Sequence, residues 1–207
     1  MNKELKNMLC KMNKERLNLF AKTVVHMSLL VLEANGEIAE VIAGRDIWDF
    51  EIDDELLSAS KLWFDEVKNN EPFKDIFSEL YEIDYQSKGR NINGFFSTPP
   101  DISYLISSLI CSVESKAYKK DFDDFCCGAG VFALQSFSMH PFRNYHLNDK
   151  DSFMCAVSAM QILSNIATYR IYPKSIQITN QNALLNEHIP FLTVKFNYQT
   201  IIKERNA

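Results

Sequence analysis

The stretch from Asp121 to Leu134, DFDDFCCGAGVFAL, decides how the rest of the chain is interpreted. It predicts a short strand, a glycine turn and a helix that ends near His140. Gly128 and Gly130 allow a tight turn and a close approach to a ligand, and the N–H groups of the following helix would face an anion. A lone Gly-x-Gly is a weak signal, so an ordinary tight turn remains an alternative to a nucleoside or phosphate site.

The residues after this stretch alternate between strand and helix patterns. Strands are predicted at 144–147, 175–179 and 191–196, and a helix is predicted at 152–167. Such alternation calls for parallel strands with right-handed crossovers. The predicted fold class is therefore α/β, a Rossmann-like core with a partial parallel sheet and flanking helices.

The residues before this stretch show helical periodicity. Helices are predicted over 17–31 and 56–67, and a third begins at Pro72 and runs to about Tyr81. The polar run QSKGRNIN, 86–93, interrupts the periodicity and marks a boundary. We therefore predict an all-helical N-terminal region, 1–88, and a Rossmann-like domain, 89–207.

Composition restricts the classes of function. The chain has 207 residues, 46% of them hydrophobic, which suits one core with a helical appendage and excludes a large multidomain enzyme. A net charge of −5 is the opposite of the basic face typical of nucleic-acid binding. Five irregularly spaced cysteines predict a reducing, cytoplasmic environment without disulfides or a metal site. No signal-peptide pattern and no apolar run of about 20 residues occurs, so no membrane association is expected.

An acid follows the second predicted strand. Asp149 lies nineteen residues after Gly130, the offset at which nucleoside-binding folds place an acid for ribose hydroxyls. The alternative is a surface acid that has no connection with the turn. The two signals together favour a nucleoside-type site.

Four motifs occur in a fixed order between residues 71 and 186. They are GFFSTP at 94–99, DFCCGAG at 124–130, Asp149 with Asp151, and QNAL at 181–184. This set resembles the adenine-specific DNA methyltransferases of the type I restriction-modification class and their phage and plasmid relatives. The corresponding family motifs are Gly-aromatic-aromatic followed by Thr-Pro, Asp-Pro-Cys-Cys-Gly-Ser-Gly, acid-Ile-Asp-Pro and Gly-Asp-Ser/Ala-Leu. Phe125 stands where the family commonly has Pro, and Ser152 replaces the Pro of the third motif.

The resemblance implies a methyltransferase core with a pocket for S-adenosylmethionine. Thr98 would hold the methionine carboxylate and amine, and Asp124 and the glycine turn would cradle the same end of the cofactor. Asp149 would bind the ribose, and Asn182 would meet the adenine amine as a weaker partner than the usual aspartate. The cofactor-binding residues implied in this way are Phe96, Thr98, Pro99, Asp124, Cys126, Gly128, Gly130, Asp149, Lys150, Asn182 and Ala183.

The aromatic rings and the paired cysteines have two interpretations each. Phe95, Phe96 and Phe125 either line the pocket or belong to the core. Cys126 and Cys127 either act as nucleophiles or are small buried side chains of the family, and we favour the second interpretation because no His stands nearby in the sequence.

The resemblance is poorest at the catalytic loop. The family places an Asn/Asp-Pro-Pro-aromatic loop after the fourth strand, where it binds a flipped-out adenine. Asn197 and Tyr198 are the candidate catalytic residues, but both prolines are absent. The alternative is a fourth strand that runs to the end of the chain, in a sheet truncated at this point. Such a sheet would expose an edge carrying Val194 and Phe196, so we expect a homo-oligomer or a second protein subunit.

These observations leave three functional hypotheses. The first is a methyltransferase that acts on the exocyclic amine of adenine, with DNA as its partner. The second is a catalytically silent protein on the same scaffold, which binds the cofactor or serves as an interaction subunit of a restriction-modification or DNA-processing system. The third is a small-molecule methyltransferase, which lacks the support of the resemblance.

Overall fold

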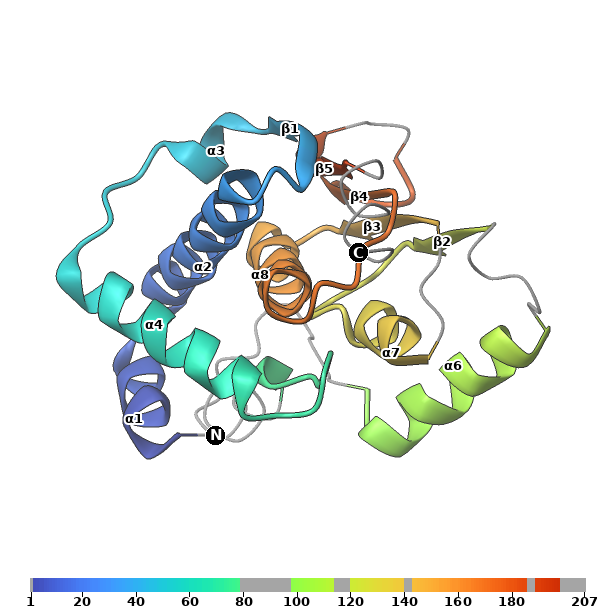
Figure 1. The fold of residues 1–207 in the computed structure, drawn as a ribbon, viewed down its shortest axis with the longest axis horizontal. Coiled ribbons are helices and arrows are strands. Elements are labelled where there is room, and N and C mark those ends of the chain that lie inside the picture. Colours follow the sequence, from blue (N-terminus) through green and yellow to red (C-terminus); the bar gives the residue numbers. More distant parts are fainter. Residues whose placement is uncertain (1, 79–97, 114–119, 140–142, 186–188, 198–207) are drawn as a thin grey trace.

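The structure is a computed structural model that describes residues 2–78, 98–113, 120–139, 143–185 and 189–197. A five-stranded sheet with the order β1-β5-β4-β3-β2 forms its centre (Figure 1). The strands are β1 (Ile38–Ala43), β2 (Asp121–Asp124), β3 (Asn144–Asp149), β4 (Ser175–Asn180) and β5 (Pro190–Phe196). The expected α/β class is confirmed.

The sheet is mixed, so the expectation of parallel strands is confirmed for β2, β3 and β4 and is wrong for β5. Strands β2, β3 and β4 are parallel, whereas β5 runs antiparallel to β4. The physical reason is the length of the connection, because residues 181–189 are too few for the crossover of a dozen or more residues that a parallel neighbour needs.

Strand β1 corrects two further expectations. The N-terminal region is not all-helical, because β1 pairs antiparallel with β5. This pairing also covers the predicted free edge of β5, whose Val194 and Phe196 are buried. The pattern of β1 is weak in the sequence, since an edge strand buries few of its side chains.

Seven described helices accompany the sheet. They are α1 (Lys3–Lys11), α2 (Lys14–Ala34), α3 (Arg45–Trp48), α4 (Asp54–Lys68), α6 (Pro100–Val113), α7 (Val131–Met139) and α8 (Ser152–Tyr169). Helices α2, α8 and α7 lie side by side along one face of the sheet (Figure 1). Every residue of α8 from Phe153 to Ala167 is buried, because this helix lies between the sheet and the N-terminal helices.

Alternation along the strands separates the two faces of the sheet. Val41, Val194, Ile176, Tyr145 and Phe122 form one row across the sheet and pack beneath the helices. The next row carries mainly polar residues: Ile42, Thr193, Gln177, His146 and Asp123. Only the first face is therefore suited to pack against apolar helices.

Helix α2 is the one helix in the described part of the chain that is long and apolar enough to cross a membrane. In the structure it packs against α8 and α4, and ten of its residues are buried. Its apolar character is accounted for by this place in the core.

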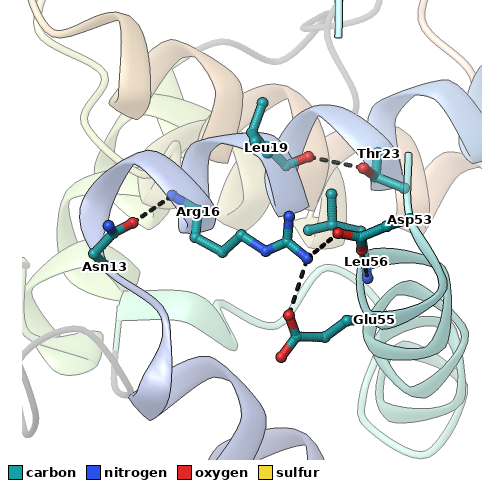
Figure 2. Close-up of polar contacts among 7 residues, drawn as sticks. All are labelled: Asn13, Arg16, Leu19, Thr23, Asp53, Glu55 and Leu56. Atoms are coloured by element: carbon teal, nitrogen blue, oxygen red, sulfur yellow. Dashed lines mark hydrogen bonds and ion pairs between the residues drawn. The ribbon is translucent and has the colours of Figure 1, made fainter. Parts of the chain in front are cut away.

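Polar contacts fix α2 against α4 (Figure 2). The Asp53 side chain accepts a hydrogen bond from the Leu56 N–H at 2.9 Å and so caps the start of α4. Arg16 of α2 donates to the same Asp53 carboxylate and to Glu55, the latter at 2.9 Å. Asp53 thus caps α4 and, together with Glu55, joins this helix to α2.

The helix predicted to begin at Pro72 does not form over residues 72–76. This segment is a turn, in which Phe73 has a φ of 60°. The Asn165 side chain of α8 accepts from the Phe73 N–H at 2.7 Å, and the Phe73 ring stacks on Phe137 with centroids 4.7 Å apart. These tertiary contacts override the local helical periodicity.

Candidate functional site

A cavity of about 520 Å³ lies at the carboxyl ends of the parallel strands β2, β3 and β4. Ligands of open α/β sheets bind at this edge, and the volume is within the usual range for small-molecule sites. The segments after the three strands supply much of its lining, together with Ser78, Thr98 and Met154. The residues that follow the strands therefore decide what this site can bind.

The glycine turn forms one wall of the cavity. Gly128 and Gly130 have φ values of 52° and 84°, in the left-handed region that favours glycine. A Cβ on Gly130 would lie 3.1 Å from the Cβ of Ser158, so the turn approaches α8 closely. Cys127 anchors the turn to β3, because its N–H donates to the Asn148 carbonyl at 2.8 Å. The strand–turn–helix expected from the sequence is present.

Asp149 joins β3 to the glycine turn. One carboxylate oxygen accepts from the Gly128 N–H at 3.0 Å, and the other accepts from the Asp151 N–H at 2.9 Å. Each carboxylate oxygen can accept a second hydrogen bond. Asp149 is thus positioned beside the turn and keeps capacity for the hydroxyls of a ribose.

Asp124 contributes a buried oxygen without a partner. Its Oδ1 accepts from the Cys126 N–H at 3.2 Å, while its Oδ2 has no hydrogen-bond partner among the described residues. Burial raises the pKa of this carboxyl, and the charge of Asp149 adds to the rise. An unsatisfied buried acceptor is unfavourable, so this site fits a ligand that brings a positively charged donor. The methionine ammonium of S-adenosylmethionine is a group of this kind.

Asn148 is a site residue that the sequence interpretation missed. Its amide donates to the Phe125 carbonyl at 3.0 Å and to the Gln181 carbonyl at 3.1 Å, and its Oδ1 accepts from Thr179 at 2.9 Å. It therefore ties together the loops after β2 and β4. The available signal was its place directly before Asp149 at the end of a strand.

Gln161 of α8 is the second missed residue and lies below the cavity. Its Nε2 donates to the Ala129 carbonyl and to Asp75, both at 2.9 Å. Its Oε1 accepts from the N–H groups of Ile76 and Phe77 at 3.0 and 3.1 Å. This fully buried amide links the glycine turn to the segment that carries Ser78. A glutamine within an apolar helix pattern was the only signal for it.

The structure brings most of the expected cofactor residues together. Seven of them line the cavity: Thr98, Cys126, Gly128, Asp149, Lys150, Asn182 and Ala183. Asp124 and Gly130 support the turn from beneath and are not part of the lining, and neither is the exposed Pro99. Phe125 lines the cavity with 68% of its surface exposed. Phe95 and Phe96 lie outside the described residues.

Asn182 is engaged within its own loop. Its Oδ1 accepts from the Leu184 N–H at 3.1 Å, and the residue is exposed. The same oxygen was expected to accept from an adenine amine, so only its second lone pair is available for that contact.

The structure does not bring Asn197 to the cavity. Because β5 is antiparallel, its carboxyl end lies at the opposite edge of the sheet from the ends of β2, β3 and β4. There the Asn197 N–H donates to the Glu37 carbonyl at 2.7 Å. Asn197 therefore lies outside this pocket, whereas the sequence led us to expect it there as a catalytic residue. Tyr198 lies outside the described residues.

Two of the cysteines near the turn are buried thiols. Burial raises the pKa of Cys127 well above its usual value and raises the pKa of Cys155 to about 12. A thiolate is the nucleophilic form, and it is disfavoured at both positions. Cys126, in contrast, is exposed and lines the cavity.

The arrangement combines an anion-tolerant turn, an acid for hydroxyl groups and a buried acid for a cation. A nucleoside ligand with an amino-acid or amine extension satisfies all three requirements. Comparisons of the chain with protein-family models, curated proteins and solved structures give no match.

Proposed function

We propose that the chain binds S-adenosylmethionine in this cavity, as the scaffold of a protein that resembles adenine-specific DNA methyltransferases. The observation that carries the proposal is the unpartnered Oδ2 of Asp124 beneath a turn that Asp149 holds from the next strand. Of the residues that line the cavity, Thr98 would bind the methionine end, Asp149 the ribose, and the loop at 181–184 the adenine. Asp124 lies behind this lining, and its unpartnered Oδ2 would take up the charge of the methionine ammonium. When bound, the cofactor supplies an activated methyl group.

We further propose that the chain acts as a cofactor-binding or interaction subunit without stand-alone catalysis. Asn197 supports this choice, because the candidate for the base-binding amide lies at the opposite edge of the sheet from the cavity. The protein would then serve a restriction-modification or DNA-processing system through a partner.

Methyl transfer to the exocyclic amine of adenine is the second candidate. It is favoured by two apolar side chains at the cavity, Phe125 and Leu184, which are 68% and 92% exposed. Exposed apolar groups beside a cofactor site suit stacking against a flipped-out base.

Calorimetric titration with S-adenosylmethionine tests the central proposal. We expect binding that Asp149→Asn weakens by about tenfold, the effect of losing a charge-assisted hydrogen bond. Asp123→Asn is the matched control, because Asp123 lies on the polar face of the sheet and binds His146 at 2.8 Å. Absence of binding by the unmodified chain would overturn the proposal.

Cys126 offers a second readout that does not depend on heat changes. Because its thiol is exposed in the cavity, bound S-adenosylhomocysteine should slow its alkylation by iodoacetamide. Cys10, half-buried on α1, reports any general change in reactivity. Equal protection of both thiols would point away from binding in this cavity.

A methylation assay separates the silent subunit from the enzyme. The expected result with tritiated cofactor and unmethylated DNA is no transfer by the isolated chain. Transfer that is lost in Phe125→Ala but retained in Asn197→Ala would instead establish the second candidate.

A further inference from the structure

A second cavity, of about 320 Å³, adjoins the proposed cofactor site. It lies between the turn that contains Phe73, the first turns of α6, and helix α7. Ser78, Thr98 and Val131 line both cavities, so molecules in the two would be separated by little more than these side chains. Apart from Thr98, the residues that line this second cavity have no part in the proposed binding of S-adenosylmethionine.

The lining has an apolar part and a charged part. Phe73, Val131 and Leu134 provide the apolar part. The charged side chains are Glu71, Lys74 and Asp75, so two acids and one base give a formal charge of −1. A lining of this composition favours a ligand with an apolar body and a positively charged donor.

Asp75 is held in a fixed orientation. Its Oδ1 accepts from the Ser78 N–H at 3.1 Å and from Gln161 Nε2 at 2.9 Å. These donors keep the carboxyl against the cavity wall without neutralising it. Burial raises the pKa of Asp75, because a charged carboxyl is poorly solvated there, while the hydrogen bonds from Ser78 and Gln161 oppose the rise.

The nearest cation in the sequence is engaged elsewhere. Lys74 Nζ donates to Asn70 Oδ1 at 3.1 Å, and the ion pairs found among the described residues include none to Asp75. A cationic ligand would supply a counter-charge that no ion pair among the described residues provides.

The volume limits the size of the ligand. A cavity of 320 Å³ corresponds to about ten water molecules at their volume in the liquid. That space accommodates a one- or two-ring molecule and excludes a peptide or a nucleotide chain.

We infer that the second cavity is a binding site for a compact organic cation, an amine or amidine on an aromatic or aliphatic body, with Asp75 as its anionic partner. The apolar body would lie on Phe73 and Leu134, and the cation would donate to the Asp75 carboxylate. This inference goes beyond the proposed function and does not depend on S-adenosylmethionine in the first cavity.

Benzamidine is a suitable probe, because it joins one aromatic ring to an amidinium group. We expect benzamidine to bind in an NMR titration of the full chain, while benzoate, of the same shape and opposite charge, does not. Asp75→Asn should weaken benzamidine binding at least tenfold, because the charge-assisted bond is lost. Asp65→Asn is the matched control: it removes an exposed acid of α4 that lies outside the lining of this cavity, and it should change binding less than threefold.

A blocking variant locates the bound probe and serves if Asp75→Asn does not fold. Ser138 is exposed at the rim of the second cavity, so Ser138→Trp should fill the entrance and abolish benzamidine binding. The same variant should still bind S-adenosylmethionine if the proposed function holds, so the two proposals fail separately. Benzamidine binding that survives Ser138→Trp, equal binding of benzoate, or no binding at about 10 mM would overturn the inference.

Discussion

Gly130 shows how one residue shapes the glycine turn. Its φ of 84° is unfavourable for any residue other than glycine. A Cβ at this position would also lie 3.1 Å from the Cβ of Ser158. Gly130→Ala should therefore lower the free energy of unfolding by about 2 kcal/mol or more, as measured by urea denaturation. Gly36→Ala is the control, because Gly36 has a φ of 69° and open space around it. Equal losses in the two variants would show that contact with Ser158 contributes nothing.

Asp124 should show opposite effects on stability and on binding. Its pKa is raised in the folded chain, mainly by burial, so the folded state binds this proton more tightly than the unfolded chain does. The contribution to stability is present below the unfolded pKa and is lost as the pH rises through the folded pKa. At neutral pH the charged carboxylate is then a net cost, and Asp124→Asn should raise the melting temperature.

The same substitution tests the cationic end of the cofactor. Asp124→Asn should weaken S-adenosylmethionine binding at neutral pH, because an amide lacks the charge that an ammonium requires. In the unmodified chain, affinity should rise as the pH rises through the Asp124 pKa, since the bound cation favours the ionised acid. An affinity independent of pH would place the ammonium elsewhere.

At the scale of elements, the Asp53 carboxylate joins α2 to α4 (Figure 2), in addition to buried side chains such as Phe20 and Trp63 that pack between the two helices. The hydrogen bond from Arg16 lowers the pKa of Asp53, and the bond from the Leu56 N–H lowers it further. With a depressed folded pKa, this group stabilises the fold above its unfolded pKa, and the effect is lost as the pH falls through the folded value. The contact should therefore weaken in acid.

Asp53→Asn isolates the charged part of this contact. Asparagine remains a good helix cap, so the variant should lose mainly the ion pair and show a smaller decline of melting temperature on acidification. Asp53→Ala should lose the cap as well and melt lower at every pH. The two variants would melt alike if the cap had no effect on stability.

At the scale of the whole molecule, α6 places polar residues inward and apolar residues outward. Ser103 and Ser107 are buried, whereas Ile102, Leu105, Ile106 and Ile110 are exposed at helical spacings. Because β1 covers the edge of β5, we expect a partner to bind at the exposed apolar face of α6 and not at that edge. No charged residue interrupts α6 between Ile102 and Val113, and the homo-oligomer expected from the sequence is the assembly whose use of this face can be tested.

Self-association through α6 can be measured by size-exclusion chromatography with light scattering. The unmodified chain should form a dimer that Leu105→Lys together with Ile106→Lys dissociates, because burying two cations is unfavourable. Leu57→Lys, at a partly exposed position on α4, should leave the dimer intact. A monomer at every protein concentration would contradict self-association through α6.

Much of the fold and the site followed from local patterns. The glycines at 128 and 130, the acid at 149 and the periodicity of 152–167 are properties of neighbouring residues, and each of these elements formed where its pattern predicted it. Six of the seven expected cofactor residues in the lining lie at or after the end of β2, β3 or β4, and they meet because the ends of parallel strands lie at one edge of a sheet; the seventh, Thr98, precedes α6.

Strand direction and long-range pairing are features that only the tertiary structure decided. Hydrophobic periodicity shows which side of a strand is buried, but it does not show the direction of the strand, so the reversal of β5 and the removal of Asn197 from the cavity required the whole sheet. The pairing of β1 and the turn at Phe73 depend on partners far away in the chain, β5 and Asn165. The sequence by itself thus determined the glycine turn and the strands and helix that follow it, whereas long-range pairing decided the place of β1, the turn at Phe73 and which ends of the strands meet at the site.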